Sequence, residues 1–543
     1  MFKLKGKWGP LILISLATFI MLVDTTAMNV SITYLVSDLD TTIGEIQNIM
    51  AIYALIMASL MLLGAKIADI IGKTRAFVLG AAIYGVGTSI AALSPNATVL
   101  LLGWSVIEGI AAALMLPTVL ALITTIYEGK DRLTAFSIYG AMASLAMCTG
   151  PFLGGTISTF LSWRFVFGGE LIIVIFILLF SKTFSDVKGE ENKGDKIDFV
   201  GALLTVLTLS SFILAFLFAK DYGWWTARKI IVIGGVHIDF FGLSITPVLL
   251  FIGLIFLIIL LLWLNHREKI KKTPLFSLTI FKNKVFSPGL IITLLTQIAY
   301  VGTLFTMPIY LQAVNDYSGF ITGLAVLPLP IGIMAISLLE PKFQKNIPPK
   351  YLVVAGGVLM SVGFIILFFL FSQDRALMIT DLILSYSFIG IGVGLVKLII
   401  NNITFSSLKK KRRDEGSGLM YTCINLGNSL STAFIGSILI ASIITNISLG
   451  VNESEIFDRD LRTKTEITTA LQTQSKKMET HPLETVKLEN NEKTEFKRII
   501  IDSFDGAMKL VLITSIIVVL IDLMVMIFFL PKKEKEEEEP EIE

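Results

Sequence analysis

Charged residues, cysteine and histidine are all scarce in this sequence of 543 residues. Only 16% of the residues are charged, whereas 54% are hydrophobic and the mean hydropathy is +0.77. A soluble protein of this length needs more charged side chains to cover its surface, so the balance excludes a soluble globular protein. The net charge of +2 gives no indication of nucleic-acid binding, and we expect no nucleic-acid partner.

The scarce residue types also exclude several kinds of chemical site. The two cysteines, Cys148 and Cys423, lie far apart in apolar segments, which favours small buried thiols over a disulfide. The three histidines lie in polar connections without the spacing of metal ligands, so we expect no metal site. No phosphate-binding G-x-x-x-x-G-K-[ST] loop and no catalytic triad is present, so we expect no cofactor, no ATP-driven step and no enzymatic activity.

Continuous apolar runs of about twenty residues are abundant, and an α-helix of that length crosses the hydrocarbon core of a bilayer. The predicted fold class is therefore an all-α polytopic membrane protein with about fourteen transmembrane helices. The first run is too long for a signal peptide and has no small-residue cleavage site, which predicts an uncleaved span. The expected spans lie near residues 11–35, 46–65, 76–94, 98–120, 135–160, 164–181, 197–219, 245–264, 285–311, 319–339, 351–371, 377–400, 416–446 and 508–530.

Lysine and arginine are concentrated in alternate connections between these spans. With the N-terminus in the cytoplasm, the basic connections all fall on the cytoplasmic side, as the positive-inside rule requires of short loops. We therefore expect a multi-pass membrane protein with both termini in the cytoplasm. The lysine- and isoleucine-rich composition adds the expectation of a bacterial plasma membrane. The basic connections are residues 66–75, 130–132, 182–196, 267–284, 342–350, 409–413 and 532–533.

The spacing of these connections suggests two halves with an inserted pair of helices. We expect one six-helix bundle in residues 1–181 and a second in residues 285–530, with cytoplasmic linkers and two additional helices in residues 182–284. The second bundle carries a long external loop at 446–507, and an acidic cytoplasmic tail follows at 531–543.

A shorter external connection, residues 220–242, contains the alternating stretch IIVIGGVHIDFF. Alternation of apolar and polar residues around a Gly-Gly pair is typical of two short antiparallel strands. The stretch therefore predicts a β-hairpin that turns at Gly234 and Gly235.

The stretch GAKIADIIGKTR is a charged, glycine-bearing island between two apolar runs. We expect a tight cytoplasmic turn, in which Gly64 and Gly72 let the backbones approach or bend. Asp69 can accept hydrogen bonds from a helix N-terminus, and Lys73 and Arg75 hold the turn in the cytoplasm. The stretch resembles the signature loop of the major facilitator superfamily, roughly G-x-x-x-D-x-x-G-[RK]-[RK]. That resemblance implies a gating loop between the second and third helices.

The first span carries a carboxylate, Asp24, about 20 Å along a helix that starts near Leu11. At that depth an ionised side chain costs at least about 2.5 kcal/mol, so Asp24 must face a cavity or a partner. Together with Thr26 and Asn29 it resembles the D-x-T-x-x-N/V signature of the fourteen-helix drug:proton antiporter branch of the superfamily. A structural hydrogen bond between helices is the alternative interpretation.

The fourth span departs from the pattern of that branch. Relatives typically carry R-x-x-Q-G there, with the arginine tied to proton coupling, whereas this chain has Ser105 and Glu108 at those positions. Glu108 is a candidate for the titrating group or for attracting a cationic substrate, and a protonated glutamate that only packs is the alternative. Glu170, in the sixth span, is a third unusual acid, which we expect in a solvated vestibule about two turns from the outer surface. The candidates for proton coupling and substrate binding are Asp24, Asn29, Ser105, Glu108 and Glu170.

The fifth span contains AMCTGPFLGG, which resembles the antiporter signature G-x-x-x-G-P-x-x-G-G with alanine at the first glycine. Gly150, Pro151, Gly154 and Gly155 match the remaining positions. Proline bends a helix, and the glycines let a second helix pack closely against the bend. The resemblance implies a hinge in an exporter rather than an importer.

The second half contains further polar features. The sequence YLQ at 310–312 resembles an element of the same branch at the end of the ninth span. We expect Asp381 and Lys397 near the membrane interfaces, and Asp522, in the middle of the last span, has no assigned role.

The resemblance implies two six-helix bundles and two inserted helices around a central cavity. It implies a monomer in the lipid bilayer that exports amphiphilic or cationic small molecules (drugs, dyes, antiseptics) in exchange for protons by alternating access. A dedicated exporter of a lipid, fatty acid or cell-envelope precursor is an alternative, because the missing arginine and the extra acids point to altered substrate or coupling. A non-transporting scaffold that binds through its external loop is the alternative from another class.

Overall fold

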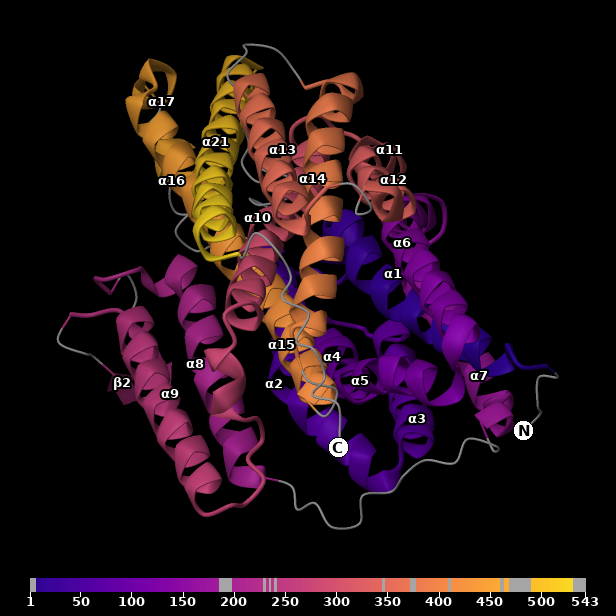
Figure 1. Cartoon of the computed structure of the whole chain (residues 1–543). Helices are drawn as coiled ribbons and strands as arrows, with labels where there is room; N and C mark the ends of the chain where they lie inside the picture. Colours follow the sequence, from indigo (N-terminus) through magenta and orange to yellow (C-terminus); the bar gives the residue numbers. More distant parts are fainter. Residues whose placement is uncertain are drawn as a thin grey trace, which may run out of the picture.

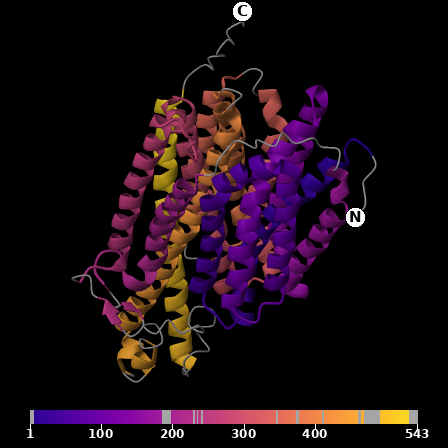
Figure 2. The ribbon, with the colours of Figure 1, turned by 90° about the horizontal axis from the view of Figure 1, so that it is seen from below.

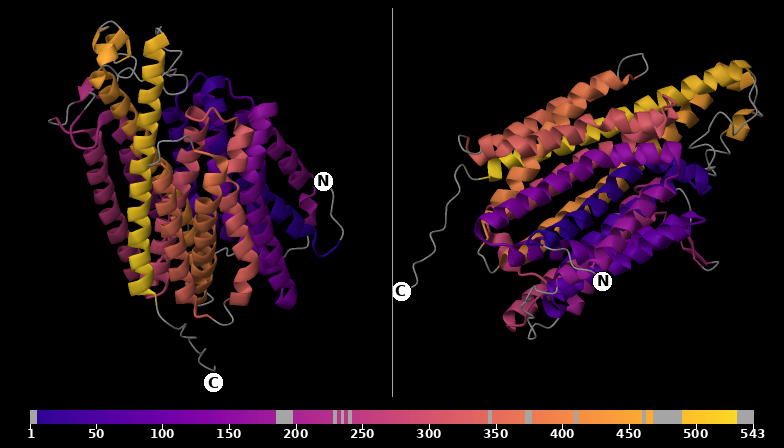
Figure 3. Two further views of the ribbon diagram at one scale, coloured as in Figure 1. Left: turned by 90° about the horizontal axis from the view of Figure 1, so that it is seen from above. Right: turned by 90° about the vertical axis from the view of Figure 1, so that its right-hand side faces the viewer.

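The computed structural model describes residues 6–184, 198–227, 231–233, 236–238, 242–343, 347–371, 377–408, 412–459, 463–467 and 490–530. Long helices lie side by side through the whole molecule, and both views in Figure 3 show them in rough alignment. The described part of residues 1–184 forms α1 (Gly9–Asp38), α2 (Ile43–Ile71), α3 (Lys73–Ala92), α4 (Ala97–Leu100), the π-helix η1 (Leu101–Glu108), α5 (Gly109–Ile126), α6 (Gly129–Phe160), α7 (Arg164–Leu179) and the 3-10 helix η2 (Ser181–Phe184).

The remaining described residues form a second series of elements. They are α8 (Phe199–Tyr222), β1 (Ile231–Ile233), β2 (Val236–Ile238), α9 (Ile245–Lys269), η3 (Leu278–Lys282), α10 (Phe286–Ala313), α11 (Gly319–Val326), α12 (Pro328–Phe343), α13 (Pro349–Leu370), α14 (Ile379–Ser406), α15 (Arg413–Leu430), the π-helix η5 (Ser431–Ile435), α16 (Gly436–Glu453), α17 (Glu455–Arg459) and α21 (Asn490–Phe529).

Twelve helical segments among the described residues are long and apolar enough to cross a membrane, which confirms the predicted all-α polytopic fold class. The predicted fifth and sixth spans correspond to α6 and α7, which are not among the twelve. α6 packs along α1 and α7 packs along α3, within the same group of helices. With these two, the fourteen predicted spans all fall on helices.

Several helix starts are fixed by polar side chains at the N-cap position. Thr42 accepts a hydrogen bond from the Glu45 backbone N–H at the start of α2, and Asn96 does the same for Val99 in α4. Ser318 caps α11 by accepting from the backbone N–H of Ile321. Such caps satisfy N–H groups that have no partner within the helix, and each contributes about 1 kcal/mol.

The inserted pair, α8 and α9, lies at one edge of the molecule (Figure 1; Figure 2). α8 packs against α2 and α16, whereas α9 contacts mainly α8. Asp198, which is buried, joins the pair by accepting hydrogen bonds from the Gly201 N–H, the Trp263 indole and the Leu275 N–H at 3.0–3.1 Å. The guanidinium of Arg267 lies 3.7 Å from the same carboxylate.

The hairpin prediction is confirmed. β1 and β2 pair antiparallel, with Ile233 opposite Val236, on either side of the two glycines where the turn is predicted. Those glycines lie outside the described residues.

The predicted cytoplasmic turn is wrong in its extent. α2 continues to Ile71 and α3 begins at Lys73, so Gly72 alone interrupts the helices. Gly72 has φ +93°, a left-handed conformation that favours glycine, which agrees with the predicted bend. Gly64 lies inside α2, where an added Cβ would meet the Ala113 carbonyl oxygen of α5 at 2.2 Å, which agrees with the predicted close approach.

The predicted external loop 446–507 is partly helical. α16 continues to Glu453, and α21 begins at Asn490 and has 40 residues. At 1.5 Å per residue α21 is about 60 Å long, roughly twice the hydrocarbon thickness of a bilayer. Its N-terminal part packs on α17 through an edge-to-face contact between Phe457 and Phe496, whose ring centroids are 6.2 Å apart.

Candidate functional site

Three carboxylates from three helices meet inside the first group of helices. Asp24 comes from α1, Glu108 from the last position of η1 and Glu170 from α7. One oxygen of each lies within 4.8 Å of the others, and the three residues are 0%, 0% and 3% exposed. We refer to these three residues as the carboxylate cluster. Such a concentration of acids inside a helical bundle is costly unless protons or cations neutralise it.

Only part of the cluster is hydrogen-bonded. The Trp104 indole donates to Asp24 Oδ2 at 2.8 Å, and the Thr88 hydroxyl donates to Glu170 Oε2 at 3.0 Å. Tyr84 makes a longer contact of 3.4 Å with the same Glu170 oxygen. Four oxygens have no hydrogen-bond partner among the described residues: Asp24 Oδ1, Glu108 Oε1, Glu108 Oε2 and Glu170 Oε1.

Close packing of α3 against η1 places Glu108 in the cluster. An added Cβ at Gly87 would lie 2.6 Å from Glu108 Cγ and 2.8 Å from the Gly103 carbonyl oxygen. The Trp104 ring is held by Phe167 at 5.8 Å and by Tyr53 at 5.7 Å between ring centroids. The π-helical turn η1 matters here because such turns change which side chains face a neighbour.

We predict that Gly87→Ala destabilises the protein, because the new methyl group overlaps Glu108 and the η1 backbone. Overpacking of this kind costs about 1–3 kcal/mol. The measurement is the unfolding temperature of the purified protein in detergent. Gly169→Ala is the matched control, because an added Cβ there meets nothing within 4 Å. Equal unfolding temperatures for the two variants would contradict the packing described here.

Several sequence-based placements need correction. Glu170 does not lie in a solvated vestibule, because it is 3% exposed and bonded to Thr88. Ser105 lies outside the cluster's hydrogen bonds and donates to the Ile49 carbonyl of α2 at 2.6 Å. Lys397 is not near a helix end: α14 continues nine residues beyond it to Ser406.

Three polar side chains in the second half have identified hydrogen-bond partners. Lys397 donates to the Tyr300 hydroxyl at 3.2 Å, and Asp381 accepts from the Met378 N–H at the start of α14. Asp522 is buried and accepts from the Thr296 hydroxyl at 2.7 Å. Asp381 therefore lies in the first turn of α14, and its position near a membrane interface stays a prediction.

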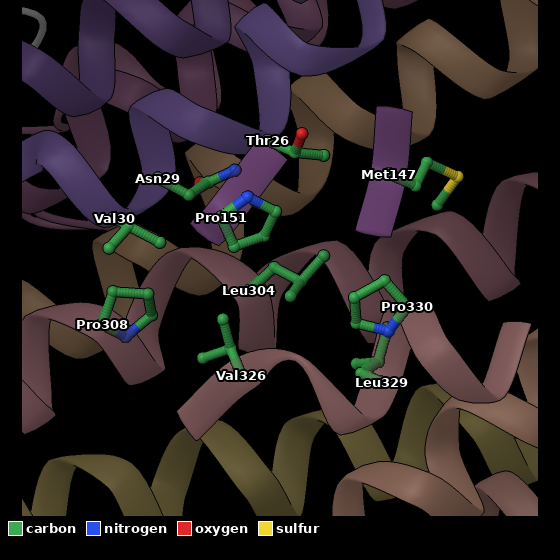
Figure 4. A pocket seen from close by; sticks show the side chains of 10 residues that line it. All are labelled: Thr26, Asn29, Val30, Met147, Pro151, Leu304, Pro308, Val326, Leu329 and Pro330. Carbon is green, nitrogen blue, oxygen red and sulfur yellow. The ribbon is translucent and has the colours of Figure 1, made fainter. Parts of the chain in front are cut away.

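A cavity lies between the first group of helices, α1–α7, and the second group, α10–α21, where α1 and α6 face α10, α11 and α12 (Figure 4). In this conformation the cavity is small: the centre of a water molecule can occupy only about 10 Å³ of it, so it has room for about one water. The lining contains no charged side chain among the described residues, and only Thr26 and Asn29 are polar. The lining residues are Thr26, Asn29 and Val30 from α1, Met147 and Pro151 from α6, Leu304 and Pro308 from α10, Val326 from α11, and Leu329 and Pro330 from α12.

α1 separates the cavity from the carboxylate cluster. Thr26, Asn29 and Val30 face the cavity, whereas Asp24 is bonded to Trp104 on the other side of the helix. Of the predicted binding candidates, the structure therefore brings Asn29 to the cavity and Asp24 to the cluster. The cluster residues do not line the cavity, so the structure gives no support for their direct contact with a substrate.

The glycines of α6 lie at two close helix crossings. An added Cβ at Gly150 would lie 1.8 Å from the Thr26 hydroxyl, and one at Gly154 would lie 2.4 Å from the Ala27 carbonyl oxygen, both on α1. Gly155 faces α11, with 2.1 Å to the Gly319 carbonyl oxygen. The predicted close packing at these glycines is thus present, and their role as a hinge stays a prediction.

Hydrogen bonds join the two groups of helices near the C-terminal end of α1. The Tyr34 hydroxyl accepts from the Gly319 N–H at 2.9 Å, and Thr159 accepts from the Phe320 N–H at 2.9 Å. Gln312, the last residue of the YLQ sequence, donates to the Val30 carbonyl at 2.9 Å. We refer to these contacts as the Tyr34 gate.

A second connection lies on the other side of the cavity along α6. The hydroxyls of Tyr139 and Tyr421 are 3.1 Å apart and join α6 to α15. The Ser144 hydroxyl donates to the Ser337 hydroxyl of α12 at 3.5 Å. Contacts between the two groups of helices therefore lie on both sides of the cavity.

Sequence reasoning missed the residues that complete the cluster, above all Trp104, Tyr53 and Thr88. Trp104 lies four residues before Glu108, so helical spacing could have placed it near that acid. No sequence pattern near Thr88 or Tyr53 indicates that either residue lies beside the acids. The predicted gate residues Asp69, Lys73 and Arg75 lie at the junction of α2 and α3, and their role stays a prediction.

The model of the Major Facilitator Superfamily matches residues 14–244 and 230–432. Multidrug resistance protein Stp of Mycobacterium tuberculosis is 24% identical over 432 residues, which cover 79% of this chain and 75% of Stp. Lincomycin resistance protein LmrB of Listeria innocua is 26% identical, with 78% of this chain and 85% of LmrB covered. Probable multidrug resistance protein EmrY of Escherichia coli is 25% identical, with 78% and 79% covered.

Among solved structures, a crystal structure of a peptide transporter POT in complex with sulfate matches with a TM-score of 0.56. The alignment covers 97% of this chain and 98% of that one, at 14% sequence identity. At this level of identity the likeness shows the fold alone.

Proposed function

The chain belongs to the major facilitator superfamily, and we propose that it exports amphiphilic or cationic compounds across a bacterial plasma membrane in exchange for protons. The observation that carries this proposal is the cavity between the two groups of helices, lined almost entirely by carbon atoms. Such a lining suits the apolar part of an amphiphile, and its two polar side chains suit a single polar group. The relatives named for multidrug and lincomycin resistance support the same class of substrate.

In this proposal the protein is a monomer with two six-helix bundles, residues 1–181 and 285–530, and an inserted pair within 182–284. Both termini lie in the cytoplasm, which places the Tyr34 gate on the external side. Transport requires the Tyr34 gate and the Tyr139–Tyr421 contact to break in turn, so that the cavity opens to one side at a time. Each hydrogen bond contributes only about 0.5–1.5 kcal/mol, so a few of them keep the two states close in free energy.

Protons are proposed to act at the carboxylate cluster. Asp24 and the cavity-lining residues Thr26 and Asn29 lie on the same helix, so a change at Asp24 can move the cavity wall. Protonation of Asp24 weakens its charge-assisted hydrogen bond from Trp104 and frees α1 to shift. The coupling is then indirect, through α1, and does not need the arginine that Ser105 replaces.

The cavity is tested by filling it. Val326→Trp is expected to reduce export of lipophilic dyes from energised vesicles by at least tenfold, because the indole takes the space between α1, α6, α10 and α12 that a substrate needs when the cavity opens. Leu324→Trp is the matched control: residue 324 is two positions away on α11 and 38% exposed. Unchanged dye export in the Val326→Trp variant, with the protein folded, would contradict the proposal.

A lipid or fatty acid exporter is a second candidate, because the uncharged lining also suits an acyl chain. The same vesicles distinguish the candidates. Export of a fluorescent fatty acid without export of any lipophilic cation would favour the lipid exporter.

A further inference from the structure

We propose that Asp24, Glu108 and Glu170 bind a hard metal cation of about the size of Ca²⁺ in the interior of the first bundle. This inference rests on the proposed function, which assigns proton coupling to the carboxylate cluster. It adds a second ion that binds at the same site. The cation and protons would compete for the same carboxylate oxygens.

The oxygens available in the cluster are the ligands that such a cation prefers. Four carboxylate oxygens have no hydrogen-bond partner among the described residues, and both oxygens of the fully buried Glu108 are among them. Carboxylates are ligands for Ca²⁺, Mg²⁺ and Na⁺, whereas zinc and copper sites favour histidine and cysteine, which the cluster lacks.

A residue other than the acids also points to a ligand. The Tyr53 hydroxyl is buried and has no hydrogen-bond partner among the described residues. Its ring packs on Trp104, whose indole donates to Asp24, so Tyr53 lies beside the cluster. A buried hydroxyl left without a partner is costly, and a cation held between the acids would give its oxygen one.

The spacing of the cluster suits a cation of this size. Ligands on opposite sides of Ca²⁺, at 2.3–2.6 Å each, lie about 4.6–5.2 Å apart, and for Mg²⁺ about 4.0–4.2 Å. One oxygen of each acid lies within 4.8 Å of the others, a limit that the separation of Ca²⁺ ligands can meet, so one ion can contact all three carboxylates. Mg²⁺ also keeps several waters, which side chains with 0–3% exposure do not accommodate readily.

The charges also balance with such an ion. If one of the three carboxyl groups retains a proton, the other two carry two negative charges, which Ca²⁺ neutralises. Na⁺ has the same preference for oxygen ligands and would leave two protons in place. Because bound metal replaces protons on its ligands, binding releases protons into solution.

The test is equilibrium binding to the purified full-length protein in detergent. We expect one radioactive Ca²⁺ to bind per chain, with proton release on binding. Tb³⁺, a luminescent substitute for Ca²⁺, should be sensitised by the Trp104 indole, which lies 2.8 Å from Asp24, and Ca²⁺ should displace it. Glu108→Gln and Glu170→Gln should each lower the affinity at least about tenfold, since even residues outside the ligand shell contribute 10–100-fold.

Asp522→Asn is the matched control, because Asp522 is a buried carboxylate outside the cluster and its loss should leave binding unchanged. Binding of Na⁺ but not Ca²⁺, with the same dependence on Glu108 and Glu170, would support the Na⁺ form of the proposal. Two results would overturn it: no binding of either ion to protein that unfolds cooperatively, or binding that neither glutamine variant weakens.

The binding assay uses no substrate and no gradient, so its failure is distinguishable from failure of the proposed transport. A protein that exports dyes in exchange for protons but binds neither ion keeps the proposed function and loses only the metal site.

Discussion

Asp24→Asn and Glu108→Gln are each expected to abolish dye export driven by a pH gradient while the protein stays folded. An amide cannot carry a proton on and off at neutral pH, so neither variant can exchange protons for substrate at that position. The free energy of unfolding should not fall. An ionised acid in mid-membrane costs at least about 2.5 kcal/mol, and a neutral amide avoids that cost. The asparagine can still accept the Trp104 hydrogen bond through its carbonyl oxygen.

The measurement is the initial rate of dye export from vesicles with and without a pH gradient. Downhill movement of dye without a gradient should persist in both variants, because the cavity is intact. Asp522→Asn serves as the control and should export at the rate of the wild-type protein. Gradient-driven export at a normal rate in both cluster variants would contradict the proposed coupling site.

Gly155→Val is expected to reduce transport at least tenfold by preventing the Tyr34 gate from closing. The first atom of the valine side chain would lie 2.1 Å from the Gly319 carbonyl oxygen, and a backbone oxygen cannot move aside as a flexible side chain can. The conformation with α6 and α11 in contact is thereby destabilised. A conformation with that side open is not affected by the clash.

Gly140→Val is the matched control, because it lies on the same helix and its added Cβ meets nothing within 4 Å. The glycine-to-valine change alters helix propensity equally in both variants. A difference in their export rates therefore reports only the close contact between α6 and α11. The readouts are dye export and the labelling rate of a cysteine introduced at Thr33, beside the gate. The account expects faster labelling in Gly155→Val, and slow labelling with normal export would contradict it.

The fold was predictable because continuous apolar runs indicate the membrane helices and the glycine positions indicate where helices pack closely or bend. Each predicted span falls on a helix, and Gly64, Gly72 and Gly155 lie where backbones approach or bend. Loop lengths were not predictable in the same way. A charged stretch such as the one before Gly72 can remain helical outside the membrane. Charged side chains favour contact with water, but they do not end a helix.

The carboxylate cluster could be predicted only in part. Each acid was conspicuous because it interrupts an apolar span, but Glu108 lies 84 residues after Asp24 and Glu170 lies 62 residues after Glu108. No spacing rule connects side chains so far apart, so their meeting depends on which helices pack together. Histidine spacing gives no indication of a metal site, and carboxylates from three distant helices produce no sequence spacing that could indicate one.

The most direct test of the central claim is proton movement in vesicles that contain only this protein. A pH gradient is imposed, a lipophilic cation is added, and the lumenal pH is followed. The account predicts that addition of the cation dissipates the gradient in wild-type vesicles and leaves it intact in Asp24→Asn vesicles. A gradient that no amphiphilic compound dissipates, with dyes still exported by the wild-type protein, would contradict proton exchange through the cluster.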